Sequence, residues 1–139
     1  MAKNFKLSII TPERLFFEGE VEMLVVESTD GQLAIMAGHE QGVIAIESGE
    51  IRIKQNGEYK DAAISSGMVT VAHDETLVMV QTVEWPEEID IRRAENDRMR
   101  AQEMLRQKNS LREYHLARTS LARAMARLRV SKSHNINHK

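Results

Sequence analysis

The chain changes character after Pro86. All seven glycines and both prolines lie within residues 1–86, and neither residue type occurs in residues 87–139. Glycine and proline form turns and interrupt regular elements, so the first segment can turn often while the second can form long helices. The sequence therefore predicts two domains, a turn-rich domain at 1–86 and a helical domain at 87–139.

Residues 1–86 show the pattern of short β-strands. Phe5, Leu7 and Ile9 alternate with polar residues, which is the period of a half-buried strand. Asn56-Gly57 is typical of a type I′ hairpin, because both turn positions require positive φ. Strands of this length and frequency predict an antiparallel β-sandwich or flattened barrel of about ten strands. Further strands are expected at 15–17, 21–26, 33–36, 43–46, 51–53, 59–65, 68–72 and 76–83, with a break at Gly19.

After Pro86, which ends the last expected strand, the apolar residues recur at helical spacing. Glu87, Glu88 and Asp90 place negative charge where the positive end of a helix dipole lies. A first helix is expected to run to about Gln107. Its apolar stripe consists of Ile91, Ala94, Ala101 and Leu105, with Met104 beside it.

A second helix is expected after Lys108-Asn109, which interrupts the first pattern. Ser110 and Glu113 have the spacing of a capping box, in which the two side chains satisfy free N–H groups reciprocally. Two amphipathic helices with a short break predict an antiparallel αα-hairpin, and the polar residues from Ser131 onward predict a frayed tail. The second stripe consists of Leu111, Tyr114, Ala117, Leu121, Ala124 and Leu128.

The two segments carry opposite charge. Residues 1–86 contain 6 Lys and Arg against 14 Asp and Glu, a net charge of −8, whereas residues 87–139 contain 13 against 7, a net charge of +6. Arg123 and Arg127 share a face of the second helix, and Arg93 and Arg100 share a face of the first. A solvated face is the commoner role of charged residues, but a surplus of one sign predicts an acidic or phosphorylated partner.

The sequence holds no recognisable catalytic constellation. It has no phosphate loop, no dinucleotide-binding glycine fingerprint and no HExxH motif. It has no cysteine, which excludes disulfides and thiolate metal sites, and His134 and His138 fall in the expected tail. No segment approaches the ~20 apolar residues that span a bilayer, and the N-terminal residues do not resemble a signal peptide. We expect a non-catalytic protein with no required cofactor or metal.

Several motifs, in this order and at these separations, resemble the epsilon subunits of bacterial F-type ATP synthases over nearly the whole chain. The motifs are Thr11-Pro12, Val21-Glu22-Met23, Asp30-Gly31-Gln32-Leu33-Ala34-Ile35, Gly38-His39, Ser65-Ser66-Gly67, Ile89-Asp90-x-x-Arg93-Ala94 and Arg123-Ala124-Met125-x-Arg127-Leu128. The resemblance implies a rotor subunit on the cytoplasmic face of the bacterial membrane, peripheral to it. Its sandwich would dock on the gamma subunit and the c-ring. Its mobile hairpin would either fold onto the sandwich or extend into the alpha/beta catalytic head and restrain ATP hydrolysis.

The resemblance also implies site residues, carried over by position. Gln32, Gly38 and His39 would lie at the interface with gamma and the c-ring. Arg118, Arg123 and Arg127 would meet an acidic segment of the beta subunit in the extended form. In several members of the family the folded form binds ATP as a regulatory ligand. The corresponding residues here are Glu84, Ile89, Asp90, Arg93, Ala94, Arg100, Arg123 and Arg127.

The chain departs from the family pattern near the expected interface. Met36-Ala37 stands where many members have Leu-Pro, and Glu40-Gln41 replaces the usual Ile-Pro after the histidine. Gln32 stands where an acidic residue often faces the ring, and Ser65-Ser66-Gly67 replaces the common Ser-Gly-Gly. These changes leave the fold prediction intact, but they bear directly on how the chain would dock.

Two other functions fit the residues. The basic hairpin suits a nucleic-acid-binding module, although Tyr114 is the only stacking aromatic among the basic residues and the acidic first segment would repel phosphate. A stand-alone nucleotide sensor is the other. The resemblance favours the rotor subunit, with no nucleic acid as partner.

Overall fold

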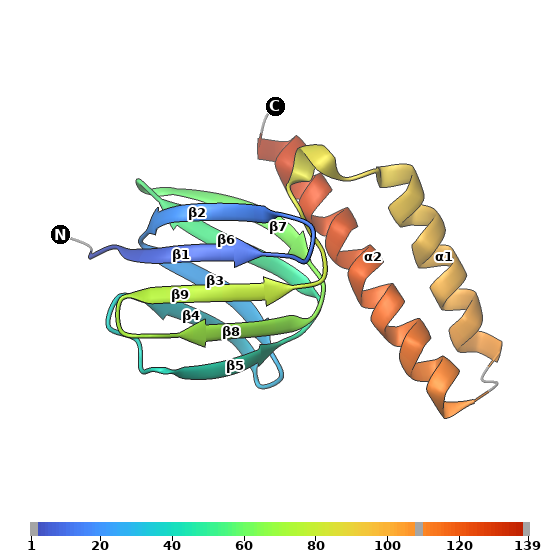
Figure 1. Cartoon of the computed structure of the whole chain (residues 1–139). Coiled ribbons are helices and arrows are strands. Elements are labelled where there is room, and N and C mark those ends of the chain that lie inside the picture. The colour runs from blue at the N-terminus through green and yellow to red at the C-terminus, as the bar shows by residue number, and fades with distance from the viewer. Residues whose placement is uncertain (1–2, 108–109, 138–139) are drawn as a thin grey trace.

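The computed structural model describes residues 3–107 and 110–137 and shows a β-sandwich with two helices lying beside it (Figure 1). This confirms the predicted sandwich followed by an αα-hairpin. The strands are β1 (Phe5–Ile10), β2 (Leu15–Val21), β3 (Met23–Ser28), β4 (Gly31–Met36), β5 (Gly42–Ile46), β6 (Gly49–Gln55), β7 (Glu58–Ile64), β8 (Gly67–Val71), β9 (Glu75–Val80) and β10 (Val83–Glu84). A 3₁₀ turn, η1 (Pro86–Glu88), then leads to α1 (Ile91–Gln107) and α2 (Leu111–Asn137).

The strands form one continuous sheet that folds into two layers. Its order is β10-β7-β6-β3-β5-β8-β9-β1-β2, with β4 paired along the whole of β3, Met23 to Ser28. Because β3 and β5 pair only at Ser28 and Ile46, the sheet bends there and the two layers face each other. All pairings are antiparallel except that of β1 with β9, which is parallel.

Alternating residues of both layers fill the sandwich core. Leu7, Ile9, Leu24 and Ile53 are fully buried, as the period-2 pattern of their strands requires. The hairpin turn at Asn56-Gly57 has φ values of 53° and 78°, as a type I′ turn demands. The sandwich therefore has a core of its own, separate from the helices.

Several predicted boundaries differ from the structure. Gly19 does not break a strand but lies inside β2, and the break falls at Glu22 instead. The run expected at 76–83 is divided into β9 and β10 by Gln81-Thr82, whose N–H groups bond the Oγ of buried Ser65. The frayed tail predicted from Ser131 is wrong, because α2 continues to Asn137 and Ser131 is buried. The predicted interruption at Lys108-Asn109 lies outside the described residues.

The second helical stripe predicted from the sequence is divided between different faces of α2. Ala117 and Ala124 are buried, and so are Ala94 and Ala101 of the facing helix α1. Leu111 and Tyr114, by contrast, are exposed. A further pair, Ala126 and Val130, is buried on the side of α2 that lies on β6 and β7.

The start of α2 follows the predicted cap, since Ser110 Oγ accepts a bond from Glu113 N at 3.1 Å. Figure 1 shows α2 between the sandwich and α1, so that α1 lies on the outer side. Within the described residues, neither helix is long and apolar enough to cross a membrane.

Gly67→Ala should destabilise the sandwich, because a Cβ at this position would lie 2.1 Å from Met79 O. Backbone would have to move, so we expect the free energy of unfolding to fall by about 2 kcal/mol. The control is Gly42→Ala, where a Cβ would meet nothing within 4 Å. Urea unfolding measures both variants, and equal stabilities would show that β8 and β9 do not pack as described.

Candidate functional site

The helical hairpin touches the sandwich through a small apolar patch. Val130 of α2 lies against Ala63 of β7 and Ile89 of the segment before α1, and all three are buried. Alanine side chains bury little surface, and apolar burial is worth roughly 25 cal/mol per Å². The patch alone is therefore a weak attachment for a helix of 27 residues.

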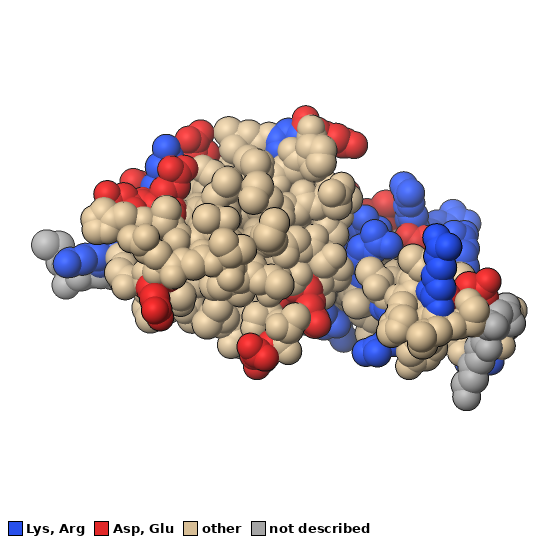
Figure 2. Space-filling model, turned by 60° about the horizontal axis from the view of Figure 1, so that its bottom comes forward, with Lys and Arg blue, Asp and Glu red and all other residues tan. Residues whose placement is uncertain are grey.

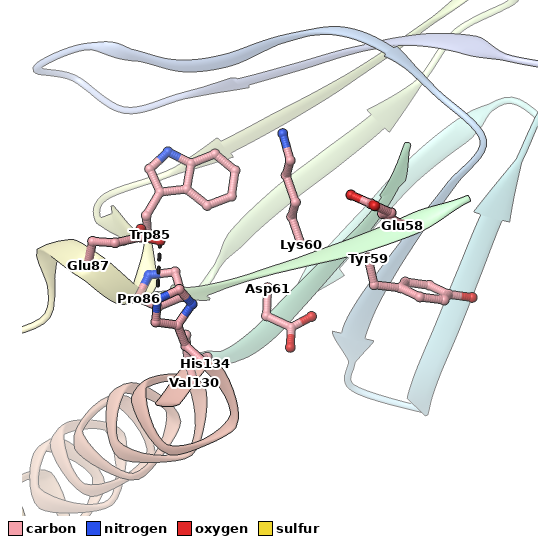
Figure 3. A pocket seen from close by; sticks show the side chains of 9 residues that line it. All are labelled: Glu58, Tyr59, Lys60, Asp61, Trp85, Pro86, Glu87, Val130 and His134. Atoms are coloured by element: carbon pink, nitrogen blue, oxygen red, sulfur yellow. Dashed lines mark ion pairs between the residues drawn. The ribbon is translucent and has the colours of Figure 1, made fainter. Parts of the chain in front are cut away.

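Three ion pairs surround this patch, and together we call them the docking latch. Arg127 Nε lies 2.6 Å from Glu84 Oε1, and Arg129 Nε lies 3.3 Å from Glu50 Oε1. His134 Nε2 lies 3.5 Å from Glu87 Oε1, a contact drawn as a dashed line in Figure 3. Each pair joins α2 to the sandwich or to the segment that leaves it. The attachment is thus largely ionic.

Arg127 is the most connected member of the latch. Besides Glu84 it reaches Asp97 of α1, with Nη1 3.7 Å from Oδ2. Asp97 also lies 3.9 Å from Arg100. The side chains of Arg127, Glu84 and Asp97 are only 26%, 25% and 30% exposed, so solvent screens them less than it screens a fully exposed pair.

The predicted arginines are brought together only in part. Arg100, Arg123 and Arg127 border a cavity of about 260 Å³ between the two helices, with Asp97 on its wall. Arg93 borders a second hollow of about 280 Å³, together with Asp90, Arg92 and Arg100. Arg93 does not line the cavity between the two helices.

The other predicted ATP contacts have structural roles in this conformation. Asp90 Oδ1 accepts a bond from Arg93 N at 3.0 Å and so caps α1. Ala94 is fully buried, Ile89 belongs to the apolar patch, and Glu84 binds Arg127. These structural roles account for Glu84, Ile89, Asp90 and Ala94 without a ligand. Asp90 also lines the hollow beside Arg93.

Asp97 lies among the predicted arginines, although the sequence did not single it out. It borders both cavities, as does Arg100, and its carboxylate lies between two arginines. Its spacing gave a signal, because Asp97 is four residues after Arg93 and three before Arg100 and so shares their face. Each cavity is smaller than a usual small-molecule pocket of roughly 300–1,000 Å³.

A larger hollow, of about 540 Å³, lies beside Trp85 (Figure 3). None of the predicted site residues lines it. Trp85 and Lys60 point to one side of β7, and Tyr59 and Asp61 to the other. Asp61 is already paired with Arg52 at 3.0 Å, and Glu87 with His134. Within residues 3–107 and 110–137 no group of three His, Asp or Glu side chains could hold a metal ion.

The predicted interface residues of the sandwich lie at the two ends of β4. Gln32 is exposed near its start, while Gly38 and His39 follow its end, where His39 Nδ1 lies 2.8 Å from Glu40 O. Six residues of extended chain span roughly 20 Å. The structure therefore does not bring these residues together, and a single partner would have to cover the length of the strand.

An uncharged face of the sandwich lies on the β5–β8 pair, whereas β4 pairs with β3. Val43 and Met68 are 66% and 47% exposed, and with Ala45 they occupy one face of the β5–β8 pair. Figure 2 shows this side of the molecule, with few charged side chains over the sandwich and many Lys and Arg over the helices.

Arg118 lies apart from the other two arginines predicted to contact the beta subunit. Its guanidinium lies 5.8 Å from the centre of the Tyr114 ring, and it borders a groove with Leu105 and Met125. Arg123 and Arg127 border the cavity between the helices instead. In this conformation the three arginines do not form one surface.

Comparison with known proteins matches both parts of the chain. The model for "ATP synthase, Delta/Epsilon chain, beta-sandwich domain" matches residues 4–86, and that for "ATP synthase, Delta/Epsilon chain, long alpha-helix domain" matches residues 87–132. An ATP synthase epsilon chain of Caldanaerobacter subterraneus subsp. tengcongensis is 42% identical over 132 residues, which cover 94% of this chain and 96% of that one. One of Alkaliphilus oremlandii is 47% identical over 105 residues, which cover 76% and 78%.

Solved structures show the same fold at much lower identity. A chain in the Euglena gracilis mitochondrial ATP synthase, OSCP/F1/c-ring, has a TM-score of 0.79 at 17% identity and covers 93% of this chain and 81% of its own length. A chain in the Tetrahymena thermophila mitochondrial ATP synthase central stalk/c-ring has a TM-score of 0.68 at 12% identity, with 93% and 97% covered.

The Glu84–Arg127 pair should contribute measurably to stability. In a double-mutant cycle with Glu84→Gln and Arg127→Gln we expect a coupling energy of about 1 kcal/mol at low salt, since the pair is only partly screened. The control cycle uses Glu103 and Arg106, whose side chains are 61% and 79% exposed and 3.7 Å apart. Urea unfolding at low and high salt measures both, and equal coupling in the two cycles would contradict the special role of the latch.

Proposed function

The chain belongs to the delta/epsilon chain family of ATP synthase subunits, and from this membership we propose a specific role within the rotary complex. It acts as a non-catalytic rotor subunit of the central stalk. It couples rotation of the c-ring to ATP synthesis in the catalytic head, and its helical hairpin restrains ATP hydrolysis. It works on the cytoplasmic face of the bacterial membrane, peripheral to it.

The sandwich is the part that docks on the gamma subunit and the c-ring. Its uncharged face at Val43, Ala45 and Met68 offers apolar surface to a partner, while Gln32 lies in β4 and Gly38 and His39 follow the end of that strand. An interface of this kind needs an apolar centre with polar residues at its rim. The sandwich has apolar surface on the β5–β8 pair and polar residues on and after β4.

The hairpin is the part that moves, and one observation carries this proposal. α2 is attached by a small apolar patch of Val130, Ala63 and Ile89 and by three ion pairs rather than by a large apolar interface. Ion pairs can be exchanged for others of similar strength, so a competing anionic surface can take the arginines from Glu84 and Glu50. In the extended form Arg118, Arg123 and Arg127 meet an acidic segment of the beta subunit, and the alpha and beta subunits then surround the hairpin.

ATP acts on the same equilibrium as a regulatory ligand of the folded form. The fork-shaped guanidiniums of Arg93, Arg100, Arg123 and Arg127 suit phosphate oxygens, and the last three already border one cavity. A ligand that binds only the folded form stabilises it by RT ln(1 + [L]/Kd). Since the same arginines cannot serve ATP and the beta subunit together, low ATP releases the hairpin to inhibit hydrolysis.

Removing the arginines of α2 should relieve the inhibition of hydrolysis. Synthase depleted of this subunit is reconstituted with the parent chain or with Arg118→Ala/Arg123→Ala, and ATP hydrolysis is measured. We expect at least a tenfold weaker inhibitory effect from the variant, because two charge-assisted contacts to an acidic partner are lost. Lys3→Ala/Lys60→Ala, which removes two charges from the sandwich, should inhibit as the parent does. Equal inhibition by all three chains would place the brake outside the hairpin.

ATP should raise the melting temperature of the isolated chain. Arg123→Ala should weaken the affinity for ATP by about tenfold, the loss of roughly 1.4 kcal/mol from one arginine–phosphate contact. The matched control is Arg106→Ala, an exposed arginine on α1 that pairs with Glu103. A thermal-shift titration up to millimolar ATP measures these effects. A parent chain whose melting temperature does not change with ATP would end the claim that it senses the nucleotide.

A further inference from the structure

The segment between the sandwich and the hairpin is fixed to β2 by Arg14. The Nη2 of this arginine donates to Val83 O at 3.2 Å and lies 2.9 Å from Glu88 Oε2. Glu88 in turn accepts a bond from Trp85 N at 2.9 Å. Both ends of the segment 83–88 are therefore held by one side chain from the start of the chain. We call this segment the linker.

Aromatic side chains hold the same linker. The ring of Trp85 stacks on that of Phe16 with 4.4 Å between centroids, and it meets Phe17 edge-on at 6.4 Å. The guanidinium of Arg14 lies 5.1 Å from the centre of the Phe16 ring. All three rings pack against the core of the sandwich. The linker thus belongs structurally to the sandwich and not to the hairpin.

The electrostatics of the Arg14–Glu88 ion pair agree with this geometry. The hydrogen bond from Arg14 holds the pKa of the Glu88 carboxyl below its usual range, against the opposing effect of burial. The same bond raises the pKa of Arg14. Both charged forms are favoured together, so the contact persists at neutral pH.

The hydrogen bonds of the linker end at Ile89, and those of α1 begin at Asp90. The N–H of Ile89 donates back to Pro86 O at 3.2 Å, which closes the 3₁₀ turn. The carbonyl and side chain of Asp90 accept from Ala94 N and Arg93 N, each at 3.0 Å, and so belong to α1. The described residues show no hydrogen bond from the start of α1 back to the linker. Between these two bonded units no hydrogen bond of the described residues spans ψ of Ile89 and φ of Asp90.

We propose that Arg14, Phe16 and Trp85 are positioning residues that keep the linker on the sandwich and confine the rotation of the hairpin to the Ile89–Asp90 junction. This inference rests on the proposed function, because it describes how the released hairpin moves. Ile89 remains with Ala63 on the sandwich while Val130 leaves. A hinge of one junction restricts the direction of the released helices, since only two dihedrals change.

Cross-linking in the reconstituted synthase tests whether the hairpin rotates at the Ile89–Asp90 junction, which we call the pivot. The chain has no cysteine of its own, so introduced pairs react alone with a short, reducible bis-thiosulfonate reagent. Cross-linked Arg14→Cys/Glu88→Cys should inhibit hydrolysis at least as strongly as its reduced form, because the linker does not need to open. Cross-linked Glu50→Cys/Arg129→Cys should lose at least tenfold in inhibition and regain it on reduction, because it fixes α2 to the sandwich. If both cross-linked variants lost inhibition, the pivot would be overturned, because the linker would then have to separate from the sandwich.

Hydrogen exchange on the full chain decides the pivot independently of inhibition. In the Glu84→Gln/Arg127→Gln variant, the amides of Glu88 and Ile89 should keep their protection while α2 at Val130 loses at least tenfold. Equal loss at all three positions would overturn the proposal. If the cross-link from Glu50 to Arg129 leaves inhibition unchanged, the proposed function fails, and the exchange result alone then supports or overturns the pivot.

The conservative substitution separates positioning from mere stability. Arg14→Ala should weaken inhibition by about threefold, since the hairpin would be less well directed, and Arg14→Lys should restore it because lysine can still pair with Glu88. Equal loss in both variants, or no loss in Arg14→Ala, would contradict the role of Arg14.

Discussion

The attachment of α2 to the sandwich determines what the rest of the structure can do. It consists of one small apolar patch around Val130 and of ion pairs made by Arg127, Arg129 and His134. A large apolar interface would fix the hairpin permanently, whereas ion pairs can be exchanged for other anionic partners at little net cost. Residues 87–139 carry a net charge of +6. Part of it pairs with carboxylates of the sandwich, at Glu84 and Glu50. An acidic partner or a nucleotide can compete for the same arginines.

The local pattern of the sequence was sufficient for the architecture. Alternation such as that of Phe5, Leu7 and Ile9 and the Asn56-Gly57 turn follow from rules that act within a few residues, so strands and hairpins could be predicted from them. Proline and glycine placement predicted the change from strands to helices after Pro86. Spacing placed Arg123 and Arg127 on one helix face, but only the family resemblance joined Arg100 to them in one expected site.

Contacts between residues far apart in the chain could not be predicted in this way. Arg14 and Glu88 are 74 residues apart, and nothing near either one signals their bond. The continuation of α2 through Ser131 was missed because its polar residues suit a frayed end, whereas in the fold Ser131 is buried and His134 approaches Glu87. The stripe on α2 was read as one face because alanines at 117 and 124 and larger residues at 111 and 114 fit a single period. Only the packing of α1 and of the sandwich separates them.

The distance between the hairpin and the sandwich tests the central claim most directly. Spin labels at Ser66→Cys and Thr119→Cys, both exposed positions in a chain without cysteine, report this distance within the assembled synthase. With saturating ATP, we expect one distance population that corresponds to the docked helices. After removal of ATP, a second and longer population should appear. A single distribution that is unchanged by ATP and by salt would show that the helices never leave the sandwich, and it would contradict the account.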